Sequence, residues 1–99
     1  MHKRTKALAI SAQTKRIVYD RDGGLCIFCG RPGDPVAHVV RRSRGGLGIP
    51  ENIVTACAMC HREFDEGRRS AEMMQTAIAY MENLYPGWSR ENVTFTKGF

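Results

Sequence analysis

Apolar residues recur every three or four positions along residues 70–84. This series consists of Met73, Met74, Ala77, Ile78, Met81 and Leu84. The spacing predicts an amphipathic helix over about 70–84 with Ser70 as its N-cap. A packed core face is the preferred interpretation of this stripe, although three methionines are also typical of a partner groove.

Two shorter helices are expected earlier in the chain. The first runs from the N-cap Ser11 to Asp20, with Ile17 and Val18 on its apolar face, and the second covers residues 60–66. Each is followed by glycine, which is typical of a helix C-terminus.

Two β-branched runs, residues 36–40 and 53–56, predict short strands. The glycine-rich loop between them has about a dozen residues, so the pair is expected to form an open hairpin. A further edge strand is expected over residues 93–96.

Composition and charge narrow the class of protein. A chain of 99 residues has the size of a single domain, expected here over residues 11–99 after a basic, mobile arm at 1–10. The composition, 42% hydrophobic and 25% charged, excludes collagen-like and fully disordered classes. No apolar run approaches the ~20 residues of a membrane span, and no export signal is recognised, so a soluble cytoplasmic protein is expected. The net charge of +5 favours a polyanionic partner.

Four cysteines form two Cys-x2-Cys pairs, Cys26 with Cys29 and Cys57 with Cys60. Two such turns can direct four thiolates at one tetrahedral zinc ion, which would be structural because no coordination position stays open. Two disulfides are one alternative, but disulfides rarely persist in a reducing compartment. Two redox dithiols are the other, and a second dithiol at matched spacing makes that interpretation less economical. His61 is a less favoured substitute for one thiolate.

Four further residues are candidates for a role in chemistry. His38 has the near-neutral pKa of a general base, or else satisfies a buried hydrogen bond. His61 and Asp65 are four residues apart on one helix and could share a divalent cation, or else form a surface pair. Asn52 by itself is a common turn former.

A family resemblance favours the functional interpretation of these residues. It is carried by three stretches: residues 26–30 with the first cysteine pair, 37–46 with the Ser-Arg-Gly-Gly loop, and 51–61 with Asn-Ile-Val and the closing Cys-x2-Cys-His. Together they resemble HNH endonucleases, most of all the small zinc-bearing proteins of phages and prophages, over about residues 14–66. The resemblance implies an α+β, treble-clef-like ββα-metal domain, with its core at about 24–66 and flanking helices. If the protein is phage or prophage encoded, it would act in the bacterial host cytoplasm.

The same resemblance implies a metal-dependent DNA endonuclease that leaves 5′-phosphate and 3′-hydroxyl ends. His38 matches the general base, Asn52 the residue that braces the loop, and His61 a ligand of Mg²⁺ or another divalent cation. Many family members carry a metal ligand directly before the base, where this chain has Ala37. Asp65 is the expected replacement.

Arg41, Arg42 and Arg44 are expected to contact the DNA backbone because of their charge and position. Two other functions remain open at this point. One is a zinc-stabilised nucleic-acid-binding module that has lost catalysis. The other is a structural zinc module that docks proteins through the methionine stripe.

Overall fold

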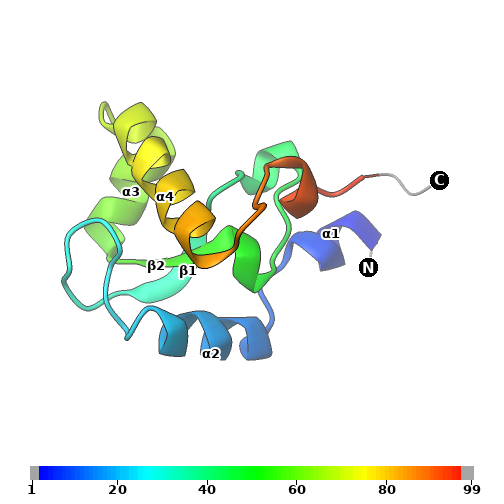
Figure 1. The fold of residues 1–99 in the computed structure, drawn as a ribbon, viewed down its shortest axis with the longest axis horizontal. Coiled ribbons are helices and arrows are strands. Elements are labelled where there is room, and N and C mark those ends of the chain that lie inside the picture. Colours follow the sequence, from blue (N-terminus) through cyan, green and yellow to red (C-terminus); the bar gives the residue numbers. More distant parts are fainter. Residues whose placement is uncertain (1–2, 97–99) are drawn as a thin grey trace.

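A computed structural model of the chain describes residues 3–96. Its helices and strands follow the order α1 (Lys3–Leu8), α2 (Ala12–Arg21), β1 (Asp34–His38), β2 (Ile53–Ala56), α3 (Ala58–Glu66) and α4 (Ser70–Leu84) (Figure 1). Short 3-10 turns lie at η1 (Arg42–Arg44), η2 (Pro50–Asn52) and η3 (Glu91–Val93). A two-stranded antiparallel sheet surrounded by helices confirms the predicted α+β class.

The sheet is a hairpin whose strands end beside the glycine-rich loop. His38 pairs with Ile53, and a bulge interrupts the register between Pro35 and Ala37. The strand expected over 36–40 instead covers Asp34–His38. Beyond His38 the chain leaves the ladder, because the next backbone N–H, that of Val39, donates to the Asn52 carbonyl at 2.8 Å.

The core lies between the sheet and the two helices that follow it. Figure 1 shows α3 and α4 on one side of the hairpin and α2 on the other. Met73, Ala77 and Met81 of α4 pack with Phe64 of α3 and with the buried strand residues. Most of the methionine stripe is therefore core, as preferred from the sequence.

A buried ion pair at the end of α2 ties this helix to the sheet and to α4. Arg21 donates to the Ile53 carbonyl at 2.8 Å and to Asp22 at 2.8 Å. Asp22 also accepts from the Thr55 backbone N–H and from the Tyr80 hydroxyl. Burial alone would raise the pKa of Asp22, but the hydrogen bonds from Arg21 and Tyr80 lower it below its usual value. The pair thus ties α2 to β2, from Ile53 at the loop end of the strand to Thr55.

The N-terminal segment differs from the expected mobile arm. Met1 and His2 lie outside the described residues, but residues 3–8 form α1, and Leu8 is only 2% exposed. The backbone N–H of Gly48 donates to the carbonyl of Ala7 at 3.0 Å. The segment therefore packs against the glycine-rich loop, and its one strongly apolar side chain explains why.

Three local predictions were wrong. Residues 93–96 do not form a strand, since η3 ends at Val93 and Thr94 makes only an isolated bridge with Gly46. Ser70 is the first residue of α4 rather than its N-cap, and its hydroxyl donates to the Phe64 carbonyl at 2.6 Å. Ile17 is 44% exposed, because the buried face of α2 runs through Thr14 and Val18.

Among the described residues, no helix combines the length and the apolar character that crossing a membrane requires.

Candidate functional site

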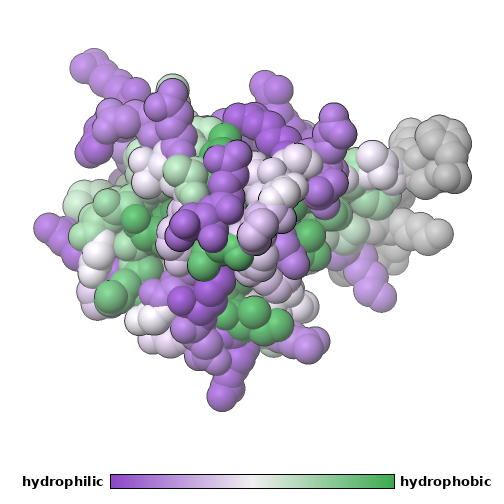
Figure 2. All heavy atoms as spheres, viewed as in Figure 1, coloured by the Kyte–Doolittle hydropathy of each residue, from purple (hydrophilic) through white to green (hydrophobic). Residues whose placement is uncertain are grey.

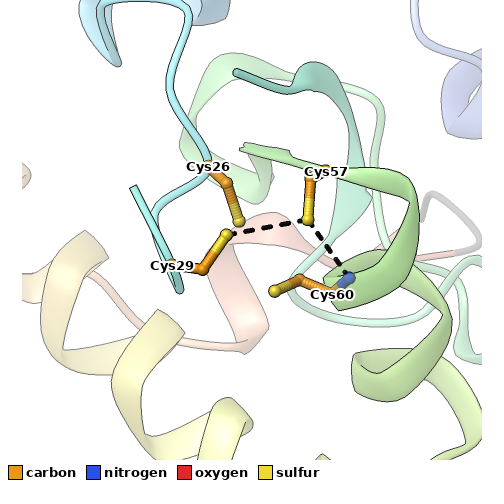
Figure 3. Close-up of side chains that lie close together, drawn as sticks. All are labelled: Cys26, Cys29, Cys57 and Cys60. Carbon is orange, nitrogen blue, oxygen red and sulfur yellow. Dashed lines mark hydrogen bonds between the residues drawn. The ribbon is translucent and has the colours of Figure 1, made fainter. Parts of the chain in front are cut away.

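The four cysteine sulfur atoms converge on one point (Figure 3). The first pair lies on the turn between α2 and β1, where Gly30 takes a positive φ of 79°. The second pair begins α3, whose N-cap is Cys57. All four sulfur atoms lie within 4.8 Å of one another, and those of Cys29 and Cys57 are 3.7 Å apart.

These distances fit a tetrahedral metal centre. Metal–sulfur bonds of ~2.3 Å place tetrahedral sulfur ligands ~3.8 Å apart. All four cysteines are free, which argues against the two disulfides. Burial and the neighbouring sulfur atoms, first that of Cys57, raise the pKa of the Cys60 thiol. Four thiolates would repel one another in so small a space, and a bound cation removes that repulsion.

A second cluster lies beside α3 and includes the histidine that directly follows Cys60. His38, at the end of β1, lines a cavity of about 280 Å³ together with His61 and Asp65 of α3. Arg41, Arg42 and Ser43 complete the lining. The fold therefore brings His38 close to His61 and Asp65, which follow it in the sequence by 23 and 27 residues.

A backbone contact fixes the imidazole of His38. Its Nε2 lies 2.9 Å from the carbonyl oxygen of Leu8, at the end of α1. A carbonyl oxygen can only accept, so in the neutral ring Nε2 carries the proton and Nδ1 keeps its lone pair. Burial lowers the pKa of His38 from its ordinary value, with a further lowering from Arg42. The ring is thus held neutral with one basic nitrogen.

The pair on α3 is preorganised. His61 Nε2 and Asp65 Oδ2 are 3.2 Å apart and partly exposed. Neighbouring ligands of an octahedral cation with ~2.1 Å bonds are ~3 Å apart, so these two atoms fit one divalent ion. Across residues 3–96, the cysteine set is the only group of three or more candidate metal ligands. His38 does not join the pair as a third ligand, which leaves it free to act as a base.

Ala37 is buried and supplies no ligand. Its side chain belongs to the core together with Phe64 and Val54. Because side chains alternate along a strand, Ala37 faces the opposite side from His38. Of the side chains that line the cavity, the pair His61 and Asp65 comes from α3.

Asn52 is completely buried and holds the two ends of the loop together. Its Oδ1 accepts from the backbone N–H of Val40 at 2.8 Å, and its Nδ2 donates to the carbonyls of Val40 and Leu47 at 3.1 and 2.9 Å. These bonds fix the chain two residues beyond His38. The side chain lies away from the cavity, so its effect on the imidazole is indirect.

The three arginines of the loop differ from one another. One guanidinium nitrogen of Arg41 donates to the Phe64 carbonyl at 2.8 Å and to the Ser70 hydroxyl at 2.6 Å, which ties the end of α3 to the start of α4. Arg42 and Arg44 lie on η1 with exposed side chains. No carboxylate within residues 3–96 pairs with either. Contact of all three with DNA stays a prediction.

Two members of the site were missed from the sequence. Ser43 lines the cavity with its hydroxyl-bearing side chain, and the Leu8 carbonyl positions the imidazole. A backbone carbonyl has no signature in a sequence. The nearest signal for Leu8 was its own apolar side chain within a basic segment.

Comparison with known proteins agrees with this geometry. Residues 26–64 match the HNH endonuclease family. A relative is the Type IV methyl-directed restriction enzyme EcoKMcrA of Escherichia coli (strain K12), 28% identical over 80 residues. The match covers 71% of this chain but only 29% of that protein, so the chain spans less than a third of its relative. The strands, loop and α3 around one cavity, beside a four-cysteine cluster, have the predicted ββα-metal arrangement. Over residues 26–64, the chain is thus similar to the HNH endonuclease family.

Proposed function

We propose that the protein is a metal-dependent endonuclease that hydrolyses phosphodiester bonds of DNA. The observation that supports this function best is the shared cavity of His38, His61 and Asp65, with arginines on its rim. Phosphodiester hydrolysis needs a base, a group that neutralises developing negative charge, and positive charge to hold the polyanion. The residues that line this cavity supply a candidate for the base, for the cation ligands and for the positive charge.

His38 is the proposed general base. Its Nδ1 takes a proton from a water molecule, whose oxygen attacks phosphorus while the bond from phosphorus to the 3′-oxygen breaks. The products are a 5′-phosphate and a 3′-oxygen that gains a proton from solvent. With Nε2 donating to the Leu8 carbonyl, Nδ1 is the nitrogen left to accept the proton, and the same bond favours the imidazolium that forms.

His61 and Asp65 are the proposed ligands of a catalytic cation, Mg²⁺ or another divalent ion. Such an ion, when bound, supplies positive charge next to the phosphate oxygens. A two-residue site leaves most coordination positions to water and phosphate, which suits Mg²⁺. Asn52 is proposed as a positioning residue, because it acts through Val40 and the loop. Arg42 and Arg44 are proposed to hold the DNA backbone.

The four-cysteine cluster is the proposed site of one structural zinc ion. It joins the turn before β1 to the start of α3, the helix that carries His61. Thiols stay reduced in the cytoplasm, which is therefore the proposed compartment.

The competing function is a binding module without catalysis. It is favoured by Ala37, since a two-ligand cation site binds metal more weakly than a three-ligand one. The two functions differ in one measurement, the nicking of supercoiled plasmid by zinc-loaded protein in magnesium, manganese, nickel or added zinc. Methylated and unmethylated plasmids are both tested, because the relative is named as methyl-directed.

His38→Ala is expected to lower the cleavage rate by ~10²–10⁴-fold, the usual contribution of a general base. Zinc content and circular dichroism should not change. Gln75→Ala, on the exposed side of α4, is the matched control. Cleavage by His38→Ala at the parent's rate would refute the assigned base. Salt-sensitive DNA binding by the parent with no nicking in any metal would establish the binding module instead.

A further inference from the structure

A second cavity, of about 570 Å³, adjoins the first. Three separate segments form it: the η1 turn, the connection between α3 and α4, and the segment that leads into η3. Each contributes arginine, and the four are Arg41, Arg44, Arg68 and Arg90. Figure 2 shows long hydrophilic side chains projecting from the upper edge of the molecule, where Figure 1 places the α3–α4 connection and the loop. We call this cavity the arginine groove.

Within residues 3–96, no carboxylate forms an ion pair with the arginines of the arginine groove. None of the residues that line it is acidic. Arg44, Arg68 and Arg90 are exposed. Like charges gathered in a concave surface create a field that attracts anions. The neighbouring Arg69, by contrast, pairs with Glu72 at 3.2 Å.

The arginine groove is continuous with the proposed active site. Arg41 lines both cavities, and its bonds to the Phe64 carbonyl and the Ser70 hydroxyl hold it between them. When one phosphate of a polyanion lies beside His38, the neighbouring phosphates therefore extend into the arginine groove. A small anion would not need this continuity.

The lining also contains apolar surface. Met74 and Ala71 of α4 lie among the arginines. A DNA strand alternates charged phosphates with apolar sugar faces, so this mixed lining matches it better than a purely charged surface does.

We infer that the arginine groove holds the sugar–phosphate backbone next to the scissile phosphate, with Arg44, Arg68 and Arg90 as phosphate contacts. The inference rests on the proposed function for its substrate class, DNA. Arg68 and Arg90 lie outside the family segment 26–64. They extend the contact surface beyond the loop arginines to the α3–α4 connection and the C-terminal region.

The test measures DNA binding without cleavage. Zinc-loaded full-length protein carrying His38→Ala is titrated onto a fluorescent 20-base-pair duplex at a series of KCl concentrations. In this background, Arg68→Gln with Arg90→Gln removes two groove charges. The matched control, Lys15→Gln with Arg16→Gln, removes the same charge from the exposed side of α2.

The plot of log K against log salt has a negative slope, and each lost phosphate contact reduces its magnitude by ~0.9. The double variant Arg68→Gln with Arg90→Gln should therefore reduce it by ~1.8. If the affinities converge near 1 M salt, binding at 0.1 M weakens about 60-fold. The control pair should stay within about twofold of the parent. Arg68→Lys with Arg90→Lys should keep most of the slope, which separates charge loss from misfolding.

Equal slopes for the groove pair and the parent would overturn the inference. So would equal losses for the groove and control pairs, since the effect would then be one of net charge. Cleavage by the protein with His38 intact is assayed in parallel. If the groove substitutions weaken DNA binding but the protein never cleaves, the arginine groove is supported and the nuclease function is refuted. If the protein cleaves but the groove substitutions leave DNA binding unchanged, only the inference about the groove is refuted.

Discussion

Replacing Asn52 by alanine tests whether the loop is held by a single side chain. The change removes three hydrogen bonds, two to the peptide groups of Val40 and one to the Leu47 carbonyl. Water does not reach this site in the folded chain, because Asn52 is 0% exposed. Each lost bond costs ~1 kcal/mol net, so the free energy of unfolding should fall by about 3 kcal/mol.

The assay is thermal and urea unfolding of the zinc-loaded protein, followed by circular dichroism. For a domain of this size, 1 kcal/mol shifts the melting temperature by ~4–8 °C, so Asn52→Ala should melt more than about 10 °C below the parent. Asn52→Asp has nearly the same volume but replaces the amide donor that faces two carbonyls. It should therefore restore none of the loss.

The exposed Asn83 of α4 provides the control, since Asn83→Ala should change stability by less than about 0.5 kcal/mol. If Asn52→Ala also changes the free energy of unfolding by less than about 0.5 kcal/mol, the three hydrogen bonds do not hold the loop. If Asn52→Asp is as stable as the parent, the donor to the two carbonyls contributes nothing and the argument from hydrogen bonding fails.

Three further predictions concern the base and the metal. Because burial lowers the pKa of His38 and only the neutral ring accepts a proton, kcat/KM should reach its plateau at alkaline pH and decline as pH falls through a midpoint below the ordinary imidazole pKa. A midpoint above the ordinary imidazole pKa would contradict the assignment. Removal of the metal with a chelator should abolish the cooperative unfolding transition, and added zinc but not magnesium should restore it. If the circular dichroism spectrum does not change after chelation, a structural metal is excluded. A Cβ on Gly48 would overlap the Ala9 carbonyl and lie 2.9 Å from that of Leu8. Gly48→Ala should therefore release the His38 ring from the Leu8 carbonyl. The expected readouts are mixed tautomers in ¹⁵N NMR and a lower kcat at unchanged DNA affinity. A retained Nε2–H tautomer with the parent's kcat would show that α1 does not position the ring.

The parts of the fold that follow from local rules could be predicted. The strand over 53–56 and the helix over 70–84 have the bounds that their hydrophobic patterns indicated. The cysteine cluster follows from ligand spacing alone, because two tight turns have few ways to satisfy four thiols other than a shared metal. The meeting of His38 with the α3 pair followed from the family resemblance rather than from any local pattern.

The parts that depend on long-range contacts could not be predicted. Arg21 and Asp22 are adjacent in sequence and look like an exposed helix end, yet together they bond α2 to β2 and α4. Arg41 looked like a free DNA contact, but the unsatisfied carbonyls at the end of α3 engage one of its nitrogens. Which of several arginines meets a helix end is decided by the path of the loop.

His38 and His61 lie within segment 26–64, which matches the HNH family, but the segments that pack against the glycine-rich loop lie outside it. The glycine-rich loop lies between α1 and the C-terminal segment: Gly48 bonds to Ala7, and Leu47 bonds to the carbonyl of Val93 at 2.8 Å. The contact with α1 needs a backbone approach that only glycine permits at position 48. The same α1 supplies the carbonyl that selects the tautomer of His38. Orientation of the base and closure of the loop are therefore one packing event, which explains why a basic N-terminal segment contains a buried leucine.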